Sequence, residues 1–175
     1  MNTSPSFSSS PHLFGARGQS LLTHYLESVY EVYAPAQEPF KNRRVIFSFR
    51  IGEFVPVDSR QDLLFGTLAG AYLITACNPA SQPLSPLENE RRQRQLALQI
   101  EDRGWLALPA AGRSVDASWA EPSFLVIGAT ELAVRKLMRD WGQNAWLWID
   151  PAGQVHLQHH GQCPADPSLG PDSFF

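Results

Sequence analysis

The order in which strand-like and helix-like segments follow one another from residue 71 onward constrains the fold of this 175-residue chain most strongly. Two segments have the apolar spacing and the end signals of helices, and four have the composition of strands. In chain order they are a strand at Ala71–Cys77, a helix from Ser85 to about Arg103, strands at Trp105–Pro109 and Pro122–Gly128, a helix from Thr130 to Gly142, and a strand at Ala145–Ile149. This β-α-β-β-α-β order predicts a ferredoxin-like core.

Both predicted helices carry signals at their ends. Ser85-Pro86-Leu87-Glu88 is a capping box with proline at the first helical position, and Gly104 is typical of the residue that follows a helix. Thr130 is expected to cap the second helix, and Gly142 is expected to end it. Helical spacing also relates the apolar residues of that helix, Val134, Leu137, Met138 and Trp141. We therefore expect both helices to pack on one face of an antiparallel sheet.

Further elements flank this core. A helix is predicted over Ser20–Tyr33, ended by Pro35, because helical spacing relates Leu22, Leu26, Val29 and Tyr33. Arg44–Ile51 is predicted as a strand from its β-branched and aromatic residues, and Val155–His159 as the second strand of a hairpin. The predicted fold class is α+β: a two-layer α/β sandwich with a ferredoxin-like core, an extra N-terminal helix and strand, and a C-terminal hairpin strand.

The chain is predicted to hold one globular domain between two tails. Residues 1–19 begin with a Ser- and Pro-rich stretch typical of a disordered tail, and residues 161–175 are rich in proline and lack periodicity. Residues 20–160 carry the predicted elements. A hydrophobic content of 43% is enough for a domain of this length to bury a core.

Composition argues against several classes of protein. The longest apolar stretch, Leu63–Cys77, is shorter than the roughly 20 residues that a membrane-spanning helix needs. A net charge of −3 argues against a protein that coats nucleic acid, so neither a membrane nor a nucleic acid is expected as a partner. Cys77 and Cys163 are too few for a disulfide framework. We therefore expect a cytoplasmic protein.

Polar residues lie where the predicted strands meet the predicted helices, at positions that folding alone would fill with apolar residues. The candidate ligand-binding residues are Thr75, Asn78, Ser85, Asn89, Arg92, Glu121, Ser123, Gln143 and Asn144. In a β-α-β-β-α-β sheet the end of the first strand and the N-terminus of the first helix meet, so we expect these side chains to converge in one pocket. Asn78 precedes Pro79, which favours extended geometry at Asn78.

This set of residues suits a small polar or anionic ligand. A helix N-terminus offers unpaired N–H groups and a partial positive charge, and Arg92 adds a forked cation that could hold an anion. The amide side chains would orient the ligand, and Glu121 is the one acid–base candidate of the set. No reaction follows from these residues, so whether the protein is an enzyme is left open. The alternative is a protein interaction module, its partner unspecified, in which the same polar residues are structural hydrogen bonds.

Other chemistry is set aside. Cys77 ends an apolar strand, where cysteine is usually a packing residue rather than a nucleophile. The spacing of His156, His159, His160 and Cys163 loosely resembles a zinc site, but successive strand residues face opposite sides, so no metal site is predicted. No dinucleotide fingerprint is present, and no cofactor is predicted.

Several of the polar segments together resemble a known family. They are Thr75–Asn78–Pro79, then Ser85, Asn89 and Arg92, then Trp119–Glu121–Ser123–Phe124, then Gly142–Gln143–Asn144–Ala145. In this order they resemble the bacterial domain-of-unknown-function family 3293, over roughly Tyr72 to Leu157. The resemblance implies a small, mostly stand-alone bacterial protein without an assigned activity, and it implies that these polar residues act as one unit.

Overall fold

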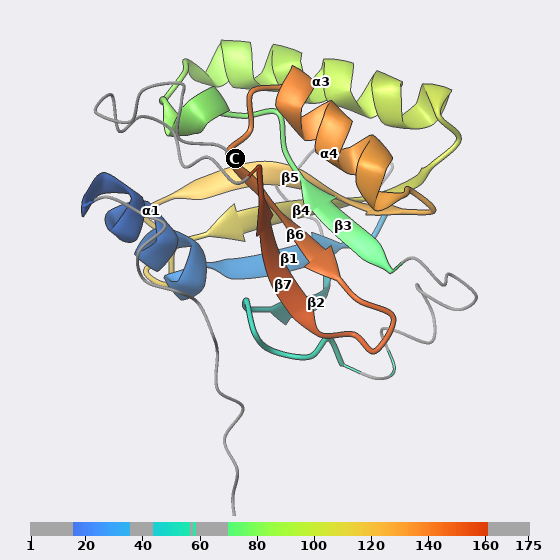
Figure 1. The fold of residues 1–175 in the computed structure, drawn as a ribbon, viewed down its shortest axis with the longest axis horizontal. Helices are drawn as coiled ribbons and strands as arrows, with labels where there is room; N and C mark the ends of the chain where they lie inside the picture. The colour runs from blue at the N-terminus through green and yellow to red at the C-terminus, as the bar shows by residue number, and fades with distance from the viewer. Residues whose placement is uncertain (1–15, 36–43, 57, 59–69, 161–175) are drawn as a thin grey trace, which may run out of the picture.

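A computed structural model describes residues 16–35, 44–56, 58 and 70–160, except for the side chains of residues 16–20. In this part of the chain three α-helices accompany one seven-stranded sheet (Figure 1). The elements are α1 (Ala16–Glu27), β1 (Val29–Tyr33), β2 (Val45–Phe49), β3 (Ala71–Ile74), the 3₁₀ turn η3 (Pro79–Ser81), α3 (Pro86–Asp102), β4 (Leu106–Arg113), β5 (Ala120–Ile127), α4 (Glu131–Asp140), β6 (Ala145–Ile149) and β7 (Val155–His159). None of the helices described is long and apolar enough to cross a membrane.

The two core helices begin and end where their capping residues predict. The Ser85 hydroxyl accepts a hydrogen bond from the Glu88 N–H at 3.2 Å, and Thr130 accepts one from the Ala133 N–H at 3.4 Å. Each satisfies an N–H group that the first turn of a helix leaves without a partner. After α3, Gly104 has a φ of +67°, a left-handed conformation that ends the helix and that glycine adopts at little cost.

The predicted helix over Ser20–Tyr33 is half wrong. Helix α1 ends at Glu27, and residues 29–33 form strand β1 instead. In this strand the buried side chains alternate, Tyr30 and Val32 pointing to the core, which is the period of a strand. Pairing with β2 on one side and β4 on the other satisfies both edges of its backbone. The helical spacing of Val29 and Tyr33 is therefore coincidental, and tertiary pairing decides the structure.

The sheet has the strand order β2-β1-β4-β5-β3-β6-β7, and each pair of neighbours is antiparallel. The prediction of a mixed α+β fold is confirmed. Helices α3 and α4 both lie over one face of the sheet, as Figure 1 shows. The sheet continues on both sides of the four inner strands, β4-β5-β3-β6, and it curls strongly. The ferredoxin-like topology of these inner strands therefore stays a prediction.

The curl brings the two edges of the sheet together at one corner. The Gly52 N–H donates to the Val155 carbonyl at 2.9 Å, and the Val155 N–H donates to the Glu53 carbonyl at 3.0 Å. These contacts join the segment after β2 to the start of β7, at opposite ends of the strand order. Because the edges meet, the face away from the helices is enclosed rather than exposed to solvent.

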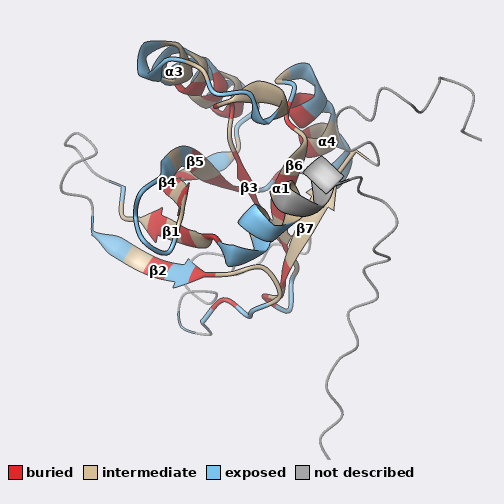
Figure 2. Cartoon of the chain, turned by 90° about the vertical axis from the view of Figure 1, so that its left-hand side faces the viewer, coloured by how far each residue is buried: buried red, intermediate tan, exposed pale blue. Residues whose placement is uncertain are grey.

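Each face of the sheet therefore has its own core. One cluster fills the inside of the curl and includes Tyr30, Phe49, Leu73, Leu125 and Ile149. The other lies between the sheet and the two helices and includes Leu96, Ile100, Leu137, Met138 and Trp146. Figure 2 shows buried residues on the sheet-facing side of α3 and exposed residues on its outer side. The sheet thus encloses a core of its own in addition to the core under the helices, and the two-layer arrangement stays a prediction.

Candidate functional site

The predicted polar residues come together where β3 ends and α3 begins, and Asn78 lies at their centre. Its Oδ1 accepts hydrogen bonds from Asn89 Nδ2 at 2.8 Å and from the Leu84 N–H at 3.0 Å. Its Nδ2 donates to Glu121 Oε2 at 2.7 Å. The Asn78 N–H donates to Asn89 Oδ1 at 2.9 Å. One side chain thus connects the end of β3, the first turn of α3 and the start of β5.

The backbone of Asn78 differs from its prediction. Its φ of 46° and ψ of 58° are left-handed, not extended. Asparagine tolerates this conformation better than most residues with a side chain. The left-handed turn sharply redirects the chain after the buried strand, and the amide group makes the contacts described above. The preference imposed by Pro79 is therefore overridden by the hydrogen bonds of the Asn78 side chain.

Glu121 places a carboxyl group inside this cluster with no positively charged partner among the residues that the structure describes. Its hydrogen bond from Asn78 is the one found for its carboxylate in the described structure, and none of the ion pairs there involves it. Burial raises the pKa of Glu121 to about 7, against the opposing effect of the Asn78 hydrogen bond. Glu121 can therefore be either protonated or ionised near neutral pH, which is the property of an acid–base group.

Gln93 connects α3 by hydrogen bonds to the segment after β3 and to β5. Its Oε1 accepts a hydrogen bond from the Ala76 N–H at 2.9 Å, and its Nε2 donates to the Pro122 carbonyl at 2.9 Å. The Thr75 hydroxyl donates to the same carbonyl at 2.8 Å. Gln93 is buried, with 6% of its surface exposed. It is not among the candidate residues of the sequence, although an uncharged polar residue in the buried stripe of a helix is a usable signal.

Arg92 also binds backbone groups in this structure. Its Nε donates to the Ala76 carbonyl at 2.6 Å, and its Nη2 donates to the Trp141 carbonyl at 2.7 Å. The guanidinium group lies 4.9 Å from the centre of the Trp141 ring, within the range of a cation–π contact. These contacts connect α3 to the end of α4. They leave the role of Arg92 toward an anion a prediction.

The remaining candidate residues surround this centre. Gln143 is buried and donates from Nε2 to the Cys77 carbonyl at 2.7 Å, and Asn144 donates from Nδ2 to the Ser81 hydroxyl at 2.9 Å. The buried Ser123 hydroxyl contacts the Glu121 carbonyl at 3.4 Å. Ser85 acts as the cap of α3, and its hydroxyl bonds to the first turn of that helix. All of these residues lie at one end of the sheet, and their binding role stays a prediction.

Glu121 faces the inside of the curled sheet. It lies opposite Gly112 on β4, which in turn lies opposite Tyr30 on β1. Directly opposed residues of antiparallel strands point to the same face, so the Glu121 side chain lies on the same face as Tyr30. Trp119, two residues before Glu121, is 45% exposed. A Cβ atom on Gly112 would lie 3.2 Å from the Tyr30 ring and 3.9 Å from the Trp119 ring, so both aromatic rings flank this position.

We expect Gly112→Ala to lower the free energy of unfolding by about 1–2 kcal/mol, because overpacking in a core costs this much. The Tyr30 ring is buried, and its hydroxyl donates to the Tyr25 carbonyl at 3.1 Å, so it has little room to move away from a new methyl group. Urea denaturation measures the effect. The same substitution in a Tyr30→Leu background is the control and should cost less. Equal losses in both backgrounds would contradict the proposed contact.

Cys77 and His156 both lie among the described residues. Cys77 is buried, and burial raises the pKa of its thiol to about 11, which keeps it protonated and unreactive at neutral pH. The imidazole of His156 contacts the Asp150 carboxylate at 3.0 Å. Cys163 lies outside the described residues. Cys77 therefore has the packing role that its place at the end of an apolar strand predicts.

The comparisons with known proteins agree with this grouping. The family model described as "Protein of unknown function (DUF3293)" matches residues 74–146. This segment contains all of the candidate residues and the elements that position them, from the end of β3 to the start of β6. Neither the search of curated proteins nor the search of solved structures gave a match. The resemblance to this family of proteins of unknown function is therefore confirmed over residues 74–146.

Proposed function

We propose that this protein binds a small polar ligand at the carboxyl group of Glu121. The observation that carries the proposal is that this group is half-buried with one hydrogen bond, from Asn78, and with no charged partner among the described residues. Burying a carboxyl group in this way opposes stability, and such costly arrangements are concentrated at functional sites. The nearby polar groups are already held in place by the protein, so a ligand would meet a preformed site.

The charge of the site favours a neutral or cationic ligand over an anionic one. Glu121 is the ionisable group that lies among the amides, and in its ionised form it repels anions. The contacts of Arg92 are with the carbonyl groups of Ala76 and Trp141. A ligand that donates a hydrogen bond to Glu121 and stacks on the exposed indole of Trp119 would satisfy both groups. Nitrogen heterocycles and amidines have this combination of properties.

Glu121 is also the group best suited to move a proton. With a pKa of about 7, Glu121 can donate or accept a proton about equally well near neutral pH. If the protein is an enzyme, we propose Glu121 as its general acid or base. Asn78 would then be a positioning residue, because its Nδ2 holds one carboxylate oxygen in place.

A second candidate function is supported by how completely the cluster is connected. The side chains of Asn78, Asn89, Gln93 and Gln143 all hydrogen-bond to protein atoms. Buried polar groups connected in this way can serve to fix one arrangement of the fold. In that case the protein is an interaction module, and its partner binds elsewhere on the surface.

A thermal-shift experiment distinguishes the two functions. The probes are adenine, cytosine, benzamidine and acetamide, at millimolar concentration and pH 7. We expect at least one of them to raise the Tm of the wild-type protein by a few degrees, because a ligand that binds the folded state stabilises it. The effect should be lost in Glu121→Gln and retained in Glu90→Gln, which changes an exposed carboxyl group on the outer side of α3.

Two outcomes would contradict binding at Glu121. One is that no probe changes the Tm of the wild-type protein. The other is that a probe raises the Tm of wild type and of Glu121→Gln by the same amount. Either would favour the interaction module.

A further inference from the structure

A second group of polar atoms lies between α4 and the end of β7 and has no hydrogen-bond partner among the residues with described positions. The indole Nε1 of Trp146 and both ring nitrogens of His160 are shielded from solvent and have no hydrogen-bond partner within the described part of the chain. Trp146 is 3% exposed, and its ring centre is 4.8 Å from that of His160. A buried polar group without a partner is costly, about 1–3 kcal/mol, and therefore requires an explanation.

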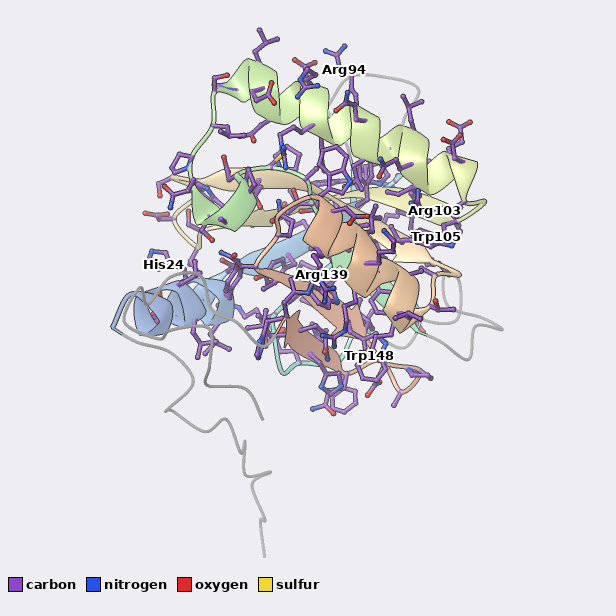
Figure 3. All side chains as sticks on the ribbon, turned by 45° about the horizontal axis from the view of Figure 1, so that its top comes forward. His24, Arg94, Arg103, Trp105, Arg139 and Trp148 are labelled. Carbon is purple, nitrogen blue, oxygen red and sulfur yellow. The ribbon has the colours of Figure 1, made fainter. Side chains whose placement is uncertain are left out.

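The charges around these atoms are positive. The Arg135 guanidinium lies 5.6 Å from the centre of the Trp146 ring and forms an ion pair with Glu131 at 3.1 Å. Arg139 forms no ion pair with any residue that the structure describes. Figure 3 shows it on the side of α4 that lies away from α3. Burial lowers the pKa of His160, and its neighbours Arg139, Arg135 and His159 lower it further.

We propose that Trp146, His160 and Arg139 form a binding site for a small oxyanion, such as a phosphate or sulfate group. An oxyanion accepts several hydrogen bonds at once, which matches the unused N–H of Trp146 and a ring N–H of His160. It also offsets the positive charge of Arg139, for which guanidinium and oxyanion are well matched. This site is separate from the site at Glu121. Its Arg139 side chain is positively charged, whereas the ionised form of Glu121 is negatively charged.

Binding at this site is linked to a proton. Among the groups that face His160, Arg135, Arg139 and His159 disfavour its charged form, while Glu131 partly offsets Arg135. A bound oxyanion reverses the sign of the local charge and thereby stabilises protonated His160. By linkage, the oxyanion must then bind more tightly as the pH falls and His160 takes up its proton. A bound water molecule would satisfy the same nitrogens without this coupling.

NMR of the full-length protein tests the proposal with sodium sulfate as the probe, because the charge of sulfate is constant between pH 5 and 8. The signals followed are the indole N–H of Trp146, assigned with Trp146→Phe, and the ring of His160. We expect a saturable shift of both signals and a higher pKa of His160 in sulfate than in sodium chloride of equal ionic strength. Arg139→Gln should weaken sulfate binding about tenfold, which corresponds to the loss of one charge-assisted hydrogen bond.

Arg94→Gln is the matched control, because Arg94 is an exposed arginine on the outer side of α3 (Figure 3). It removes the same charge and should leave sulfate binding unchanged. The proposal is overturned if the two signals do not shift in sulfate, if chloride shifts them equally, or if Arg139→Gln and Arg94→Gln weaken binding alike. Failure of the Glu121 site in the thermal-shift experiment would not affect any of these results.

Discussion

Glu121→Gln is expected to raise the free energy of unfolding at pH 8 by about 3 kcal/mol, and to change it little at pH 4. The pKa of Glu121 is raised to about 7 in the folded protein, from an ordinary value of 4.5. One pKa unit corresponds to about 1.4 kcal/mol, so a shift of this size gives the expected effect. Glutamine keeps the shape of the side chain and an oxygen that can accept from Asn78 Nδ2.

The direction of the pH dependence follows from which state binds the proton more tightly. Between pH 4.5 and 7 the folded state holds the Glu121 proton while the unfolded state has released it. The contribution of this group to stability therefore falls as the pH rises through that window, and it is constant above the folded pKa. Urea denaturation of wild type and Glu121→Gln at several pH values measures the difference directly, because every other group cancels in the comparison.

Glu90→Gln is the control for this measurement. Glu90 is exposed and pairs with Arg94 across one turn of α3, so its replacement should change stability by a few tenths of a kcal/mol. A difference between wild type and Glu121→Gln that stays constant from pH 4 to pH 8 would contradict a half-buried, uncompensated carboxyl group. It would also remove the observation on which the proposed function rests.

The parts of the fold that the sequence predicts best are those decided by local interactions. Ser85 and Thr130 cap their helices in the way their side chains predict. The hairpin from β6 to β7 depends only on a short turn between neighbouring strands. The sequence does not distinguish strand β1 from a continuation of helix α1, because the spacing of Val29 and Tyr33 fits the period of a helix and that of a strand. The pairing of β1 with β2 and β4 decides between the two structures. The curl of the sheet depends on contacts between Gly52 and Val155, which are distant in sequence.

The candidate site shows the same division. Asn78, Asn89 and Glu121 are expected together because the order of strands and helices places their segments at one end of the sheet. The carbonyl partners of Arg92 depend on how closely α4 approaches α3, and this distance is not encoded in a local pattern. The positively charged residues around His160 are brought together by the register of β7 against β6 and by the packing of α4.

Asn78→Ala is expected to lower the free energy of unfolding by about 4 kcal/mol. The substitution removes two accepted hydrogen bonds and the one donated to Glu121. Leaving these half-buried partners unsatisfied costs about 1 kcal/mol each, and an alanine at a φ of 46° adds about 1 kcal/mol. Asn78→Gly loses the same side chain but suits the left-handed backbone, so it should be the less damaging change by about 1 kcal/mol.

The combination of Asn78→Ala with Glu121→Gln shows whether the two residues act as one unit. The hydrogen bond from Asn78 favours the ionised form of Glu121, so its removal should raise the pKa of Glu121 further and increase the loss of stability at pH 8. In the double variant the uncharged glutamine that replaces Glu121 is less costly to leave without that bond. The two substitutions should therefore couple by at least about 1 kcal/mol at pH 8 and by less at pH 4. Additive effects at both pH values would mean that Asn78 stabilises the turn before α3 without controlling the ionisation of Glu121.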